Sequence, residues 1–155
     1  MDPRARFEEL RSADRVDPAD LDALWSELTP VRSADILGPW RGGDFAAGHP
    51  VSGLLEKVQW HGKRFESVER ALPLICRGDD GELYSNTELA GRGEASLWDV
   101  EFRGEVTATM VYDRLAVFDH FKAVDEHTLV GVMHGKLEQT FGNGDLYWFW
   151  LERDD

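Results

Sequence analysis

The chain has 155 residues, the length of one domain with one hydrophobic core, and its formal net charge is −13. This charge excludes the clustered cations of a nucleic-acid-binding protein and disfavours contact with an anionic membrane surface. No apolar run reaches the ~18 residues of a membrane span, and the charged N-terminus lacks a signal-peptide core. We therefore expect a soluble, cytoplasmic protein without integral membrane association. The single cysteine, Cys76, excludes an internal disulfide, and its apolar neighbours predict a buried, inert thiol.

The N-terminal part of the chain has helical periodicity. Asp17 and Pro18 are typical of a helix start, and Pro30 ends the pattern. The apolar stripe between them consists of Leu21, Leu24, Trp25 and Leu28. A shorter helix is expected before it, around Phe7 and Leu10.

A stretch rich in glycine and proline, residues 37–45, follows and surrounds Trp40. This composition predicts a bent strand where two backbones approach closely. A further helix is predicted from Pro50, because apolar residues recur at the helical period up to Val58. Gly62 fits the C-terminal cap of that helix.

From residue 72 onward the pattern changes to strands. The predicted strands are residues 72–77, 95–102, 105–112, 115–121, 127–134 and 146–151. The Gly-Asn-Gly-Asp sequence at residues 142–145 predicts the turn before the last strand. Short connections between consecutive strands from residue 95 onward favour an antiparallel meander.

Both faces of the later strands carry apolar residues. In the last strand Trp148 and Trp150 alternate with Tyr147 and Phe149, so neither face suits exposure to water. A mainly β fold satisfies this pattern if an antiparallel, lipocalin-like barrel or strongly curved sheet has its helices packed outside. A flat sheet with a helical layer on each face is the alternative. We rank the barrel first.

An ordered series of motifs carries a family resemblance. The series begins with Gly-Pro-Trp-Arg-Gly at residues 38–42 and continues with residues 49–50, 60–65 and 72–74. It continues in the second half with residues 110–113, 119–121, 124–125, 131–133, 136 and 151–153. The first group resembles the bacterial GXWXG protein family. The second is similar to the domain of unknown function that usually follows it. The family is named for a motif, so the resemblance implies no activity; the G-x-W opening is also similar to the lipocalin signature.

The leading functional prediction is a protein that binds a small apolar or amphipathic molecule, similar to a fatty acid or phospholipid, in an internal pocket. Six Trp residues are more than a core of this size needs. The predicted apolar walls are Met110, Phe118, Trp148, Phe149 and Trp150. The predicted polar anchors are Tyr112, His120, His134 and Arg153, with Arg64 as a further head-group contact. The first four either meet in one cluster inside the barrel or are separate groups, each hydrogen-bonded on its own or exposed at the surface. Trp40 is expected to plug one barrel end, with Gly38 and Gly42 giving it room, or to touch the ligand.

Other functions remain open at this point. Lys63 and Lys136 are candidates to neutralise an anionic head group, or are ordinary surface cations. An enzyme would use His120 or Asp119 as general base, and these neighbours must face opposite sides of a strand. A dimeric interaction module is a third possibility. We expect no metal or cofactor, because the histidines lack zinc-site spacing and no nucleotide-binding fingerprint occurs.

Overall fold

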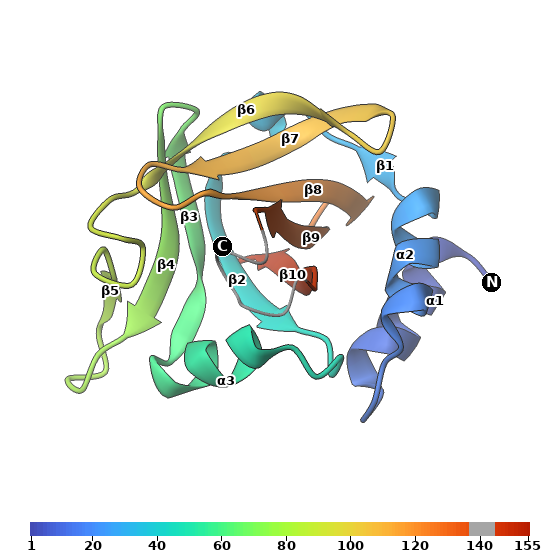
Figure 1. The fold of residues 1–155 in the computed structure, drawn as a ribbon, viewed down its shortest axis with the longest axis horizontal. Coiled ribbons are helices and arrows are strands. Elements are labelled where there is room, and N and C mark those ends of the chain that lie inside the picture. Colours follow the sequence, from blue (N-terminus) through green and yellow to red (C-terminus); the bar gives the residue numbers. More distant parts are fainter. Residues whose placement is uncertain (137–144) are drawn as a thin grey trace.

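The computed structural model describes residues 1–136 and 145–155 (Figure 1). The helices are α1 (Pro3–Ser12), α2 (Pro18–Glu27) and α3 (Pro50–Lys57), with a short 3-10 helix, η1 (Ser33–Asp35). The first strands are β1 (Thr29–Pro30), β2 (Gly38–Asp44), β3 (Trp60–Ser67), β4 (Arg70–Arg77) and β5 (Leu83–Ser85). The later strands are β6 (Ala95–Phe102), β7 (Glu105–Tyr112), β8 (Val117–Asp125), β9 (Thr128–Gly135) and β10 (Tyr147–Arg153).

The strands form a closed antiparallel barrel. The β6 to β10 strands pair consecutively, as the predicted meander requires, and β10 also pairs with β2. The β2–β3 and β3–β4 pairs and a narrow contact of β4 with β6, through Ala71 and Ala95, complete the ring. The barrel prediction is therefore confirmed, and the flat sheet is excluded. The predicted turn at residues 142–144 lies outside the described residues.

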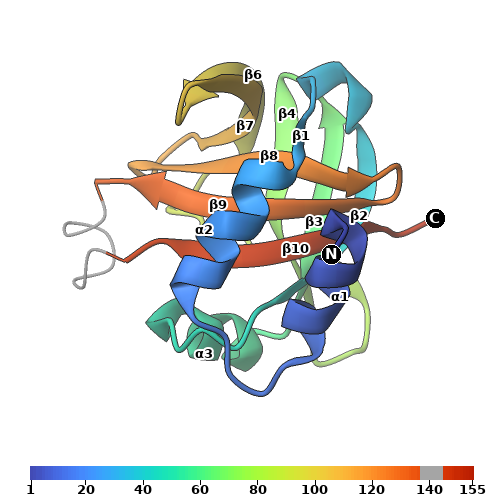
Figure 2. The same ribbon diagram turned by 90° about the vertical axis from the view of Figure 1, so that its right-hand side faces the viewer.

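Two apolar cores lie on the two sides of the barrel wall. Within β10, Tyr147, Phe149 and Leu151 belong to the interior core, whereas Trp148 belongs to the outer one. Figure 2 shows α1 and α2 lying across the outer face of β8, β9 and β10. The alternating apolar pattern of this strand thus serves two cores at once, as predicted.

The helices outside the barrel begin where the sequence places caps. Asp17 accepts a hydrogen bond from the Ala19 amide at 2.9 Å, with Pro18 at the first helical position of α2. Asp2 does the same for α1 through the Ala5 amide. The apolar stripe of α2 is buried against the outer core.

The third helix is shorter than predicted. It ends at Lys57, and Gln59 in the left-handed conformation (φ 56°) turns the chain directly into β3. Gly62 therefore lies within a strand and caps no helix. A Cβ atom at Gly62 would stand 1.9 Å from the carbonyl oxygen of Trp40, so glycine permits the close approach of β2 and β3.

Candidate functional site

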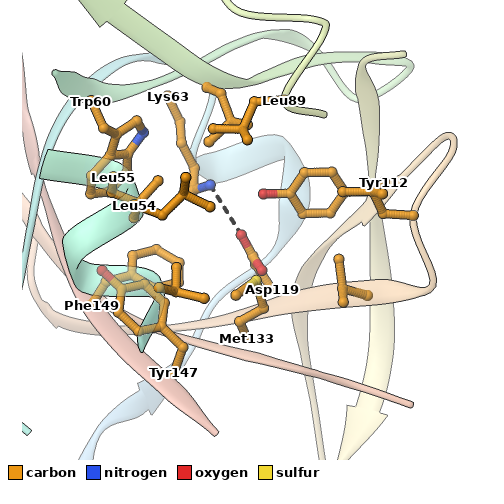
Figure 3. A pocket seen from close by; sticks show the side chains of 14 residues that line it. Leu54, Leu55, Trp60, Lys63, Leu89, Tyr112, Asp119, Met133, Tyr147 and Phe149 are labelled. Carbon is orange, nitrogen blue, oxygen red and sulfur yellow. Dashed lines mark ion pairs between the residues drawn. The ribbon is translucent and has the colours of Figure 1, made fainter. Parts of the chain in front are cut away.

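An apolar pocket with a cavity of about 100 Å³ lies inside the barrel, beneath α3 (Figure 3). Its aliphatic walls are Val51, Leu54, Leu55, Leu74, Leu89, Leu115, Val117 and Met133. Its aromatic walls are Trp60, Tyr112, Tyr147 and Phe149. The two remaining lining residues, Lys63 and Asp119, carry opposite charges.

Lys63 and Asp119 form a buried ion pair in this pocket. The Lys63 Nζ atom lies 3.0 Å from Asp119 Oδ2, and the side chains are 3% and 1% exposed. The ammonium group also donates a hydrogen bond to the Pro73 carbonyl oxygen at 3.2 Å. The second carboxylate oxygen, Asp119 Oδ1, is buried and has no hydrogen-bond partner among the described residues. The pocket therefore holds a balanced charge pair with one acceptor atom still available.

Strand alternation brings the two charges together from strands far apart in the chain. On β8, Asp119 lies in phase with Val117 and Phe121, which belong to the interior core. On β3, Lys63 lies opposite Trp40 of β2 and is buried. The odd-numbered residues within 117–121 of β8 and within 63–65 of β3 thus point into the barrel, and the even-numbered residues between them do not.

Burial in the pocket destabilises the charged forms of both Asp119 and Tyr112, so it raises both pKa values. Burial raises the pKa of Asp119, and the ammonium of Lys63 opposes this rise. Burial, and then the charge of Asp119, raise the pKa of Tyr112 well above its ordinary value. Figure 3 shows the Tyr112 hydroxyl directed toward the ion pair. At neutral pH this phenol is a hydrogen-bond donor.

Aromatic rings surround the ammonium group. The Lys63 Nζ atom lies 5.1 Å from the ring centroid of Phe149 and 5.6 Å from that of Trp60. Such distances suit cation–π attraction, which partly replaces lost hydration. The Tyr147 hydroxyl turns away to a different acceptor, donating to Asp44 at 2.8 Å.

The structure separates the residues predicted to contact a ligand. Tyr112 and Phe149 line the pocket, and Met110 lies in the interior core beside it without lining it. The outer face carries Arg64, Phe118, His120, His134, Trp148 and Trp150. The predicted polar cluster therefore does not form, because Tyr112 points inward while His120 and His134 point outward and Arg153 lies against Trp40.

His120 sits in its own aromatic environment outside the barrel. Its ring stacks on Phe102 at 4.0 Å, and its Nδ1 atom lies 2.8 Å from the Thr109 hydroxyl. Burial, followed by His134 and Arg103, lowers its pKa to about 4. It is neutral at pH 7, but it faces away from the pocket, so it cannot act as base on a molecule held there. Of the two predicted bases, only Asp119 faces the pocket.

Comparison with known proteins places this architecture in a family. The GXWXG protein family profile matches residues 23–81, and the profile of a domain of unknown function, DUF4334, matches residues 93–153. This chain belongs to the GXWXG family. A crystal structure of a protein from Thermomonospora curvata is similar over 100% of both chains, with 36% identity and a TM-score of 0.88. Comparison with curated proteins gives no match.

The GXWXG motif itself has a packing role. Trp40 is 1% exposed, and its indole N–H donates to the Ile36 carbonyl at 2.8 Å. The Arg153 guanidinium lies 4.2 Å from the Trp40 ring and donates to the Leu37 carbonyl and, at 3.1 Å, to that of Asp35. Trp40 belongs to the interior core and does not line the pocket.

Contrary to the prediction, the two glycines of the motif do not both leave space for Trp40. A Cβ atom at Gly42 would stand 2.3 Å from the ring of Trp60, a wall of the pocket. Gly38 has a φ of 113°, which other residues rarely adopt. The expectation that both glycines make room for Trp40 is therefore corrected, because Gly42 instead makes room for Trp60.

Sequence reasoning weighed Lys63 as a head-group cation or a surface residue and missed its pairing with Asp119. A signal existed on β8, where Asp119 interrupts an otherwise apolar face between Val117 and Phe121. Among residues 1–136 and 145–155, no His, Cys, Asp or Glu group is placed to hold a metal ion. Within the same residues, no helix has the length and apolar character needed to cross a membrane.

Proposed function

We propose that this GXWXG protein binds a small, largely apolar molecule in the pocket beneath α3. In this proposal the Lys63–Asp119 pair and Tyr112 anchor a polar group of the ligand, while aliphatic and aromatic walls hold its body. An apolar cavity with a few convergent polar groups is typical of small-molecule sites.

The observation that carries the proposal is the Asp119 Oδ1 atom, which lies in an apolar pocket and has no hydrogen-bond partner in the part of the chain that the structure describes. A buried acceptor without a partner costs about 1–3 kcal/mol, and a ligand that donates a hydrogen bond removes this cost. The ion pair adds little to the stability of the fold, because buried pairs are often no more stabilising than apolar residues of similar volume. Packing alone does not explain these features, because they add little to the stability of the fold, whereas a bound ligand would benefit from them.

The size of the cavity limits the body of the ligand. A cavity of about 100 Å³ is of the same order as the ~150 Å³ cavity that holds benzene in an engineered protein. A single ring or a short acyl chain suits this space, whereas the two chains of a phospholipid do not. A longer tail would have to leave past the half-exposed side chains of Leu54, Leu89 or Leu115.

Calorimetric titration with ethylbenzene, a neutral one-ring molecule whose size suits the cavity, tests the proposal. We expect saturable binding with one site per chain, and a loss of affinity of about tenfold or more when Leu115→Trp fills the pocket. Leu83→Trp, at an exposed position outside the pocket, is the control and should bind like the wild type. Absence of saturable binding, or equal binding by both variants, would refute the proposal.

The same unpaired oxygen supports a second candidate function, proton transfer. Asp119 Oδ1 would act as general base toward an acidic C–H of a bound ketone, while Tyr112 donates a hydrogen bond to the carbonyl oxygen. Incubation with cyclohexanone in deuterated buffer would then exchange its α-hydrogens faster than buffer alone. Asp119→Asn should abolish the excess, and an unchanged exchange rate would reject this function.

A further inference from the structure

The charges that face the pocket cancel. Among the described lining residues only Lys63 and Asp119 carry formal charges, and they pair at 3.0 Å. An ionised carboxylate or phosphate entering this pocket would place a second anion beside Asp119 with one ammonium between them. Desolvating a charge without a free partner is costly, so the pocket as built disfavours anions.

The remaining hydrogen-bond capacity of the ammonium group is also restricted. An ammonium has three N–H donors, and Lys63 uses two for Asp119 and the Pro73 carbonyl. Aromatic rings of Phe149 and Trp60 lie 5.1 Å and 5.6 Å from the Nζ atom. One N–H donor of Lys63 therefore remains, on an ammonium group whose charge Asp119 already balances.

Besides that N–H group, one acceptor and one further donor stay available. The acceptor is Asp119 Oδ1, which has no partner among residues 1–136 and 145–155. The donor is the Tyr112 hydroxyl, which is directed toward the pair (Figure 3). A hydroxyl group both donates and accepts, so it satisfies these two atoms at once. A carboxylate, which only accepts, leaves Asp119 Oδ1 unpaired.

We infer that the ligand of this pocket is a neutral hydroxyl compound, an alcohol or phenol with a small apolar body, and not a fatty acid. This inference rests on the proposed function and narrows it. The ligand hydroxyl donates to Asp119 Oδ1 and accepts from Tyr112, while Lys63 stays paired with Asp119 Oδ2.

Three probes with the same ring test the inference by calorimetric titration of the wild type at about pH 7, where the phenol is neutral and the benzoate is ionised. They are para-ethylphenol, para-ethylbenzoate and ethylbenzene. A hydrogen bond to a charged group makes para-ethylphenol bind at least about tenfold more tightly than either of the others. Equal or tighter binding of para-ethylbenzoate or ethylbenzene would overturn the inference and leave the proposed function intact. If none of the three binds, the proposed function itself fails.

A charge-removal variant adds a qualitative test. In Asp119→Asn the ammonium of Lys63 loses its counterion, so para-ethylbenzoate should become the preferred ligand. Asp79→Asn, at an exposed turn outside the pocket, is the matched control and should keep the wild-type order. A folded Asp119→Asn protein that keeps the wild-type order would contradict the inference. If Asp119→Asn does not fold, the three wild-type titrations decide alone.

Discussion

Removal of one partner of the buried ion pair gives the sharpest test of the site as the structure shows it. In Lys63→Met the carboxylate of Asp119, 1% exposed, loses its counterion while a side chain of similar length fills the space. Breaking a buried pair in this way costs about 3–5 kcal/mol. Since a domain of this size loses about 2–4 °C of Tm per kcal/mol, we expect Tm to fall by about 6–20 °C.

The double variant Lys63→Met/Asp119→Leu separates charge from packing. It removes both charges and replaces them with apolar groups, so most of the lost stability should return. Urea denaturation followed by circular dichroism at neutral pH measures all three proteins. If Lys63→Met lowers the free energy of unfolding by less than about 1 kcal/mol, the buried pair is refuted, because a loss that small is typical of a substitution at the surface. A double variant as unstable as the single one would mean that the loss comes from packing.

The pH dependence of the single variant follows from the same pair. Burial already raises the pKa of Asp119, and removing Lys63 takes away the group that opposes this rise. The folded variant then holds a proton that the unfolded chain releases, so its stability falls as pH rises through the raised pKa. The deficit relative to wild type should therefore shrink between about pH 8 and about pH 5. A deficit that stays constant over this range would contradict the assignment.

Three further predictions concern the rest of the fold. Proton NMR should give His120 a pKa of about 4; because its ordinary value is 6.5, stability should fall as the pH drops from 6.5 toward 4. Gly42→Ala should destabilise the protein by about 1–3 kcal/mol in thermal melts, because its Cβ meets the Trp60 ring. Gly53→Ala, with open space around its Cβ in α3, is the control and should be neutral or stabilising. Burial raises the pKa of the Cys76 thiol, so Ellman's reagent should react with it only after unfolding.

The barrel was predictable because its signals are local. The hairpin of β6 and β7 has the bounds predicted for it. The sequence of β10 has apolar residues on both faces, and each face packs into one of the two cores. Alternation along one strand decides which residues share a face, and no knowledge of partner strands is needed. The antiparallel order of the later strands followed from their short connections alone.

The site was harder to predict because it depends on which strands meet across the interior. Asp119 could be assigned to the face opposite His120, but the sequence does not say which face is inside. Lys63 lies within Trp60–Ser67, where register shifts obscure the alternation, and the predicted helix extended over its beginning. Tyr112 was grouped with His120, His134 and Arg153 by residue type alone. These side chains point in different directions, so they do not form one cluster.

The GXWXG motif and the pocket are connected through the register of β2 and β3. Trp40 pairs directly with Lys63, so their side chains share the inner face of the barrel. The indole fills the interior next to the lysine, and Arg153 lies over its ring at 4.2 Å. The ion pair is almost fully buried, and a buried charge pair acts more strongly on its surroundings than one in water. Meanwhile Gly42, at the other end of the motif, leaves space for Trp60 in the pocket wall. The motif thus shapes the pocket, although Trp40 itself does not line it.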